Sequence, residues 1–131
     1  MAGSLSDYAE NKLLDHVLGT TTYTKPTTYV ALYTAAPSDS TSGTEVSNSG
    51  GSAYARQAAS FSAASGGTTS NSGNIDFTNM PACTVVAIGI VDSGTIGAGN
   101  LLVWGTLSAN KSLDAGDTLR VATGDLDISL D

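Results

Sequence analysis

The sequence predicts a mainly β protein: an antiparallel β-sandwich or jelly-roll-like barrel of about seven strands with one N-terminal α-helix. Short apolar and β-branched segments alternate with turns rich in Ser, Gly and Thr, and a helical spacing of apolar residues occurs once, at the start of the chain. The composition, 40% apolar and 13% charged, is typical of a globular chain. We expect residues 1–131 to form a single domain, since a chain of this length can bury a core without disulfides or metals.

The helix is expected over residues 5–18, in the stretch SLSDYAENKLLDHVLGTTTY. Ser4 or Ser6 can accept hydrogen bonds from the free N–H groups of the first turn. Asp7 and Glu10 follow in that turn, where the helix dipole favours negative charge. The sequence therefore gives the helix a clear beginning.

Apolar residues recur along this helix at a spacing that places them on one stripe. They are Ala9, Leu13, Leu14, Val17 and Leu18. Gly19 stands where a left-handed C-cap would end the helix. A helix this short is marginally stable alone, so we expect the stripe to pack on the sheet or on a neighbouring subunit. Residues 1–5, ahead of the helix, are expected to reach such a neighbour.

The first half of the chain contains segments of strand character that are separated by polar loops. The expected strands are residues 28–34, 54–61 and 74–77, and the loops are residues 35–53 and 62–73. The first loop, which holds a short strand at residues 45–47, is long and flexible because it is too rich in Ser and Gly to enter a core.

The second half is expected to supply the centre of the sheet. Residues 83–92 are apolar at odd and even positions alike, which is typical of a strand covered on both faces. A Gly-rich hairpin loop, SGTIGAGN, leads to a strand over residues 101–108, and another strand follows at 118–123. After a turn at Gly124 and Asp125, the final strand alternates apolar and polar residues: Leu126, Ile128 and Leu130 with Asp127, Ser129 and Asp131.

Charge and hydropathy exclude two classes of partner. The formal net charge is −7, and the five basic residues form no run, so we expect no binding to nucleic acid. The apolar run at residues 85–91 is far shorter than a membrane-spanning helix, so we expect no membrane partner. With Cys83 as the single cysteine and no hydrophobic leader, assembly is expected in the host cytoplasm.

The residues capable of chemistry form no pattern that predicts an enzyme. His16 in the last helical turn is expected to cap carbonyls or face solvent, and Cys83 to pack as a small hydrophobe. Asp114, Asp117, Asp125 and Asp127 match no cation-binding loop and are expected to form solvated turns. The sequence contains no catalytic triad, HExxH, GxSxG or paired CxxC motif. We therefore expect no catalysis, no metal and no cofactor.

Seven segments carry a resemblance that covers essentially the whole chain. They are SLSDYAENKLLDHVLG, YVALYTAAPSDS, GTEVS, YARQ, IGIVDS, GNLLVWGTLS and AGDTLRVATGDLDISL. In their order and spacing the chain resembles a family of small virion structural proteins of tailed bacteriophages, often labelled tail fibre protein. The resemblance implies a place in the virion and implies no catalytic residue.

Two structural roles follow from this resemblance. The first is a capsid decoration or cement protein that contacts the major capsid protein and itself as a homotrimer. The alternative is a tail fibre, tail-tip or baseplate-associated protein that contacts other tail proteins and binds a receptor through residues 35–53. The candidate interface residues are Leu13, Leu14, Val17, Tyr54 and Arg56. Arg56 is expected either to form a bidentate pair with an aspartate across an interface or to be a solvated strand arginine.

Overall fold

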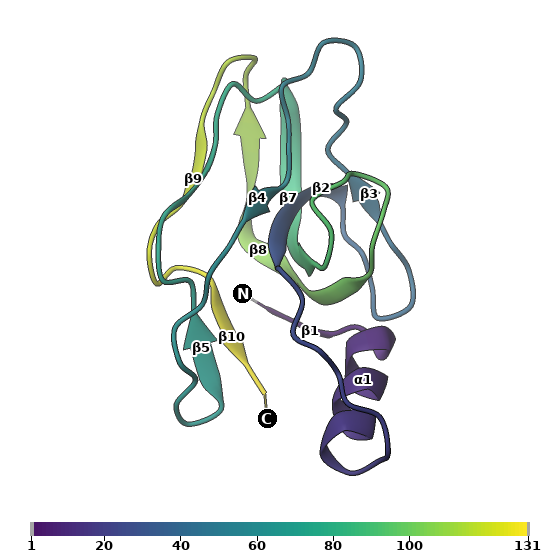
Figure 1. Cartoon of the computed structure of the whole chain (residues 1–131). Coiled ribbons are helices and arrows are strands. Elements are labelled where there is room, and N and C mark those ends of the chain that lie inside the picture. Colours follow the sequence, from purple (N-terminus) through teal and green to yellow (C-terminus); the bar gives the residue numbers. More distant parts are fainter. Residues whose placement is uncertain (1, 131) are drawn as a thin grey trace.

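The computed structural model describes residues 2–130, and it is an antiparallel β-sandwich with one helix near its N-terminus (Figure 1). The predicted fold class is confirmed, although the described residues form ten strands. The elements are β1 (Ala2–Leu5), α1 (Asp7–Val17), β2 (Tyr29–Ala35), β3 (Thr44–Glu45), β4 (Gln57–Ala58), β5 (Thr68–Ser70), β6 (Ile75–Phe77), β7 (Cys83–Val91), β8 (Leu101–Leu113), β9 (Leu119–Val121) and β10 (Asp127–Ser129). Met1 of the predicted N-terminal arm and Asp131 of the predicted last strand lie outside the described residues.

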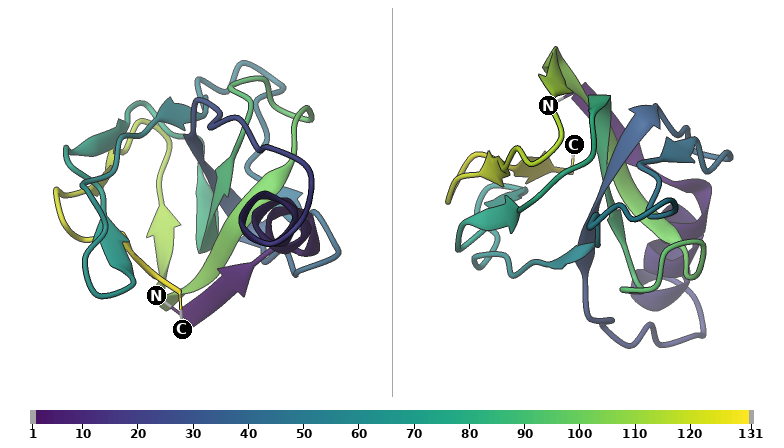
Figure 2. Two further views of the ribbon diagram at one scale, coloured as in Figure 1. Left: turned by 60° about the horizontal axis from the view of Figure 1, so that its bottom comes forward. Right: turned by 90° about the horizontal axis from the view of Figure 1, so that it is seen from above.

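The larger layer is a six-stranded antiparallel sheet in the order β1-β8-β7-β2-β3, with β4 paired to the start of β2. Its central strand, β7, is the segment predicted to be covered on both faces, and its residues from Ala87 to Val91 are all buried. The second layer consists of two short antiparallel strand pairs, β5 with β10 and β6 with β9, each joining segments far apart in the sequence (Figure 2, right).

The main core fills the space between the two layers. Its largest fully buried side chains include Phe77, Leu32, Met80 and Leu126. The rings of Tyr54 and Phe77 stack there with their centroids 6.1 Å apart. A smaller cluster on the other face of the sheet is made by Ala31, Tyr33, Ala87 and Val91. Both faces of the sheet are therefore apolar, as the sequence of β7 predicts.

The N-terminal segment differs from the prediction. The helix begins at Asp7 rather than at residue 5, because Ser6 is the N-cap and accepts a hydrogen bond from the Ala9 N–H. Residues 2–5 form β1, which pairs with Val103–Thr106 of β8 in the same chain. Ser6 is fixed to β8 as well, since its N–H and its hydroxyl donate to the carbonyls of Leu102 and Leu101. The described part of the predicted arm is thus bound to its own sheet.

The end of the helix also differs. The cap residue is Leu18, with φ −115° and ψ −24°, and Gly19 is outside the left-handed region. The Gly19 N–H donates to the carbonyls of Leu14 and Asp15. A side chain at Gly19 would meet the Asp15 backbone at 3.0 Å, so close approach explains this glycine.

Several strands have other bounds than predicted, because pairing partners rather than composition decide them. Within residues 54–61 β4 is confined to Gln57–Ala58, which pair with Tyr29 and Val30. The predicted loop at residues 62–73 contains β5, which pairs with β10. The short strand expected at residues 45–47 is β3 at Thr44–Glu45, and β8 continues to Leu113 rather than ending at residue 108.

A buried asparagine joins the parts of the second layer. Asn71, which is 1% exposed, donates to the carbonyls of Gly73 and Ala122 at 2.8 and 2.9 Å. Its Oδ1 accepts from the Leu126 N–H at 2.9 Å. One side chain therefore satisfies three backbone groups, from the segments that follow β5 and β9 and the segment that precedes β10.

Replacing this side chain tests how far the second layer depends on it. We expect Asn71→Ala to lower the free energy of unfolding by about 2–4 kcal/mol, because buried backbone groups lose their partners. The measurement is urea denaturation followed by circular dichroism. Asn48→Ala, at an exposed loop position, is the matched control and should change stability by less than about 0.5 kcal/mol. Equal effects of the two substitutions would contradict the role of Asn71.

Candidate functional site

A buried ion pair lies at one end of the six-stranded sheet. The Arg56 guanidinium donates from Nε and Nη2 to the two carboxylate oxygens of Glu45, at 2.9 and 2.8 Å. The two side chains are only 5% and 13% exposed. The remaining terminal nitrogen, Nη1, donates to the carbonyls of Ser93 and Ala98 at 2.8 and 2.9 Å. Arg56 therefore ties β3 and the loop after β7 to the segment that precedes β4.

A tyrosine connects this pair to the core. The Tyr54 hydroxyl donates to Glu45 Oε1 at 2.7 Å and accepts from the Leu32 N–H at 3.0 Å. Hydrogen bonding to Glu45 raises the pKa of Arg56, so the guanidinium keeps its charge. Burial is the main cause that raises the pKa of Tyr54, and burial also raises the pKa of Tyr33 to about 12. Both phenols are neutral at physiological pH, and the cluster is held by one charge of each sign.

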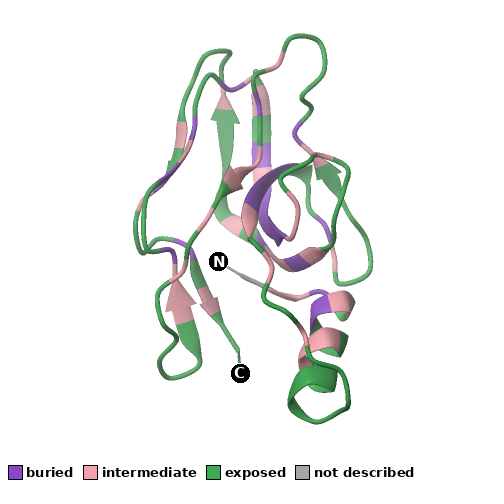
Figure 3. Ribbon diagram, in the orientation of Figure 1, coloured by how far each residue is buried: buried purple, intermediate pink, exposed green. Residues whose placement is uncertain are grey.

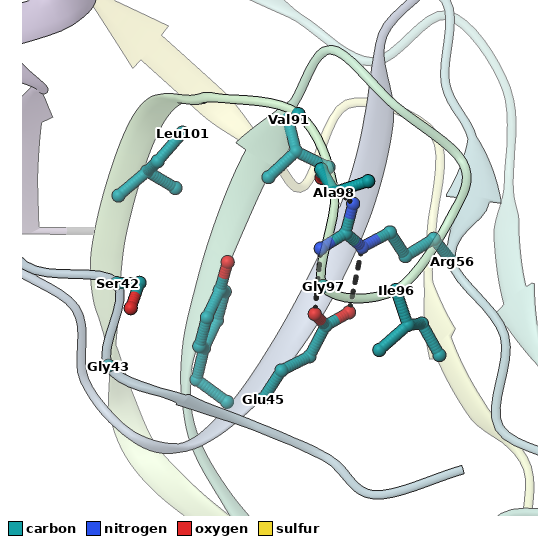
Figure 4. Close-up of a pocket in the computed structure, with 11 residues that line it drawn as sticks. Ser42, Gly43, Glu45, Arg56, Val91, Ile96, Gly97, Ala98 and Leu101 are labelled. Atoms are coloured by element: carbon teal, nitrogen blue, oxygen red, sulfur yellow. Dashed lines mark hydrogen bonds and ion pairs between the residues drawn. The ribbon is translucent and has the colours of Figure 1, made fainter.

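The ion pair forms one wall of a pocket of about 290 Å³ (Figure 4). Figure 4 shows the Glu45 carboxylate facing the Arg56 guanidinium beside Val91, Ile96 and Ala98. The lining residues are Tyr33, Ser42, Gly43, Glu45, Arg56, Val91, Ile96, Gly97, Ala98, Gly99 and Leu101. Because Glu45 already accepts hydrogen bonds from Arg56 and Tyr54, its carboxylate acts as a clamp between segments.

Two predicted interface residues thus have other surroundings than the sequence predicted. Tyr54 is 3% exposed and stacks on Phe77 in the core, so its side chain is not available to an interface. Arg56 does form a bidentate pair, but its partner is Glu45 of the same chain and not an aspartate across an interface. Sequence reasoning missed Glu45 because it lies in a Ser- and Gly-rich stretch whose pairing to β2 has no local signal.

The helix buries only the N-terminal part of its apolar stripe and exposes the rest. Ala9 is buried and Leu13 is half-buried, whereas Leu14, Val17 and Leu18 are 56%, 72% and 79% exposed. Figure 3 shows the first turn of α1 partly buried and its last turn exposed. The anchoring of Ser6 on β8 fixes the helix at its N-terminal end and leaves the other end free. We call the side chains of Leu14, Val17 and Leu18 the helix patch.

The loop between β2 and β3 is anchored more firmly than its composition predicts. The Asp39 carboxylate accepts hydrogen bonds from the hydroxyl of Ser4 and, at 2.8 Å, from the indole N–H of Trp104. These bonds, that from Ser4 first, lower the pKa of Asp39. The backbone carbonyl of Asp39 also accepts from the Asp7 N–H at 3.0 Å. The start of the predicted flexible loop is thus bound to β1, β8 and α1.

The remaining chemical candidates have structural surroundings. His16 Nδ1 accepts from the Tyr23 N–H at 3.1 Å, which holds the chain after the helix. Cys83 is half-buried at the start of β7, and burial raises the pKa of its thiol. Asp117 accepts from the Asp114 N–H within the turn between β8 and β9.

The described residues contain neither a metal-ligand cluster nor a membrane-spanning helix. Among residues 2–130, no three His, Cys, Asp or Glu side chains are grouped in a way that would hold a metal ion. The helix in this part of the chain is too short and too polar to cross a membrane.

The buried pair can be compared with an exposed one in the same chain. Arg120 pairs with Asp76 at 2.6 Å, with the two side chains 58% and 34% exposed. We expect Arg56→Lys to cost about 2–3 kcal/mol of stability, because Lys cannot form the bidentate pair and reach both carbonyls. Arg120→Lys should cost less than about 1 kcal/mol. Thermal or urea unfolding of both variants is the measurement, and similar losses would contradict the role assigned to Arg56.

The raised pKa of Tyr33 predicts a loss of stability in alkali. Between the ordinary tyrosine pKa near 10 and about 12, the unfolded chain loses this proton while the folded chain keeps it. Stability conferred by Tyr33 is therefore complete below about pH 10 and is lost as the pH rises towards 12. We expect the unfolding free energy of Tyr33→Phe to fall less steeply with pH over this range, the slope being smaller by at most the contribution of one proton. An unchanged pH slope in this variant would show that Tyr33 is not responsible.

The chain is similar to a known protein family over nearly its whole length. The family model described as podophage GP4 fiber I protein gp80 matches residues 4–129. No curated protein matches the chain. The family match extends from β1 to β10 and thus includes both layers, the ion pair and the helix patch.

Proposed function

The chain belongs to the podophage GP4 fiber I protein gp80 family, whose members are structural proteins of the bacteriophage virion, and from this we propose that it is a building block of a virion fibre. In this role it acts by lasting protein–protein contact and not as an enzyme. The helix patch is the observation that supports such a contact most directly. It exposes three large apolar side chains on a helix whose base is fixed to the sheet.

Covering the helix patch with another protein is energetically favourable, because apolar side chains leave water. Burial of one large aliphatic side chain contributes roughly 1.5–3 kcal/mol, so three adjacent ones can anchor a subunit. Leu13, Leu14 and Val17 were predicted as interface residues, and of these Leu14 and Val17 lie in the patch. The partner that fits is another virion protein with an apolar surface, since the patch itself carries no charge.

Capsid decoration is the second candidate function. It is supported by the form of the protein, because a small acidic sandwich without heptads or sequence repeats differs from the shaft of a fibre. In this role the helix patch would contact the major capsid protein, and the homotrimer expected from the sequence stays a prediction. A receptor-binding role of residues 35–53 would apply only to the exposed part of that loop after Asp39.

The position of the protein on intact particles separates the two candidates. We expect immunogold labelling and cryo-electron microscopy to place it on fibres, in a copy number that matches the number of fibres. Many copies spread over the head would instead establish the decoration role. Absence from purified particles would contradict both.

The helix patch can be tested with a matched pair of substitutions. Leu14 is 56% exposed, and Leu130, far from the helix in the sequence, is 57% exposed. We expect Leu14→Glu to lower incorporation into particles about tenfold or more, because a charge replaces an apolar contact. Leu130→Glu adds the same charge and should leave incorporation unchanged. Incorporation is measured by quantitative gel staining of purified virions.

Unfolding curves of both variants are the control for folding, since Glu and Leu have similar helix propensity. Normal incorporation of the folded Leu14→Glu protein would contradict the role of the patch.

A further inference from the structure

The outer edge of β8 extends well beyond the strand that covers it. β8 has 13 residues, whereas β1 has 4 and pairs only with Val103–Thr106. On its other side β8 pairs with β7, but a bulge between Val85 and Ala87 leaves residues 107–110 out of that ladder. Within residues 2–130, no strand pairs with the outer edge of residues 107–113. We call this stretch the β8 overhang.

Unpaired strand edges expose backbone donors and acceptors that another strand can use. Many proteins protect such edges by a covering loop or by making the strand short. The β8 overhang is a continuation of a long strand, and residues 108–112 are all exposed. Its backbone groups are therefore available to a partner, and the side chains decide which partner fits.

The sequence of the overhang is nearly a palindrome about Asn110. It reads Leu-Ser-Ala-Asn-Lys-Ser-Leu from residue 107 to residue 113. If two copies pair antiparallel with Asn110 opposite Asn110, each Leu107 faces Leu113 and each Ser108 faces Ser112 of the other copy. Ala109 faces Lys111, so neither lysine faces a like charge directly. Such self-complementarity is what a two-fold symmetric contact requires.

The two faces of the overhang agree with this register. Leu107 and Leu113 both pack at the margin of the main core. Pairing across the two-fold axis would place Leu107 next to Leu113 of the other copy and join the two cores at their margins. Ser108, Asn110 and Ser112 alternate with these residues and would form a polar ladder on the opposite face.

A pocket lies beside the β8 overhang. A cavity of about 180 Å³ lies between β8 and β9, and Leu107, Lys111 and Leu119 are among its lining residues. A second copy at this edge would cover apolar side chains that the single chain leaves half-exposed.

We propose that two copies of the chain pair antiparallel through the β8 overhang, across a two-fold axis at Asn110, to form one continuous sheet. This contact uses a different surface from the helix patch, so it is independent of where in the virion the protein lies. A strand pair is a small interface, and the repeated contacts of an assembled particle would strengthen it.

Single-cysteine variants test both the contact and its register. In antiparallel strands, directly opposite Cα atoms are about 4.5–5.5 Å apart, which is within the range of a disulfide. In a Cys83→Ser background, Asn110→Cys should form a covalent dimer under mild oxidation about tenfold faster than Asn48→Cys, an exposed loop control. A mixture of Ser108→Cys and Ser112→Cys chains should cross-link faster than either chain alone.

A non-covalent measurement completes the test. Asn110→Asp places two like charges opposite each other and should weaken the dimer in sedimentation velocity about fivefold or more, whereas Asn48→Asp should leave it unchanged. Equal cross-linking at positions 110 and 48 would overturn the proposal. A trimer in solution that is insensitive to Asn110→Asp would also overturn it.

Discussion

The buried pair of Arg56 and Glu45 is the interaction on which the rest of this structure depends. It brings together three segments that are far apart in the sequence: β3, the loop after β7 and the approach to β4. A buried charge without its partner destabilises the fold by several kcal/mol. Each of these segments is therefore stable in its folded position only when the others are folded as well. The Tyr54 hydroxyl extends this dependence to β2 through the Leu32 N–H. Irregular loops are thereby tied to the central sheet by hydrogen bonds of buried side chains.

With the frame held in this way, we propose that the exposed surfaces carry the function. The polar groups of the pocket bind one another, and the start of the long loop is held by the bonds of Asp39 with Ser4 and Trp104. By contrast, the helix patch exposes apolar side chains and the β8 overhang exposes an unpaired strand edge. Surfaces of this kind suit a subunit of a virion, because a surface that is already fixed loses little conformational entropy when it binds its partner.

Local patterns in the sequence predicted the elements that local physics determines. The cap at Ser6, the apolar run of β7 and the aromatic strand β2 are signals within one segment, and each is present in the structure. The strands β1 and β5 were missed because they are short and exist through pairing with distant partners, and β4 is shorter than predicted for the same reason. The clamp was half predicted: the bidentate geometry of Arg56 was expected, but the identity of Glu45 depends on the fold. The helix stripe was predicted as apolar, whereas its exposure follows from the anchoring of Ser6 on β8.

Hydrogen exchange measured by mass spectrometry, on the free protein and on the same protein in virions, tests this division between frame and surfaces most directly. The account predicts that exchange in the pocket segments 42–46 and 93–99 is the same in both states, with no change on assembly. It predicts that residues 12–18 of the helix and 107–113 of β8 exchange faster in the free protein and become protected in the virion. Protection that appears on assembly at the pocket segments, with the helix and β8 unchanged, would contradict the account.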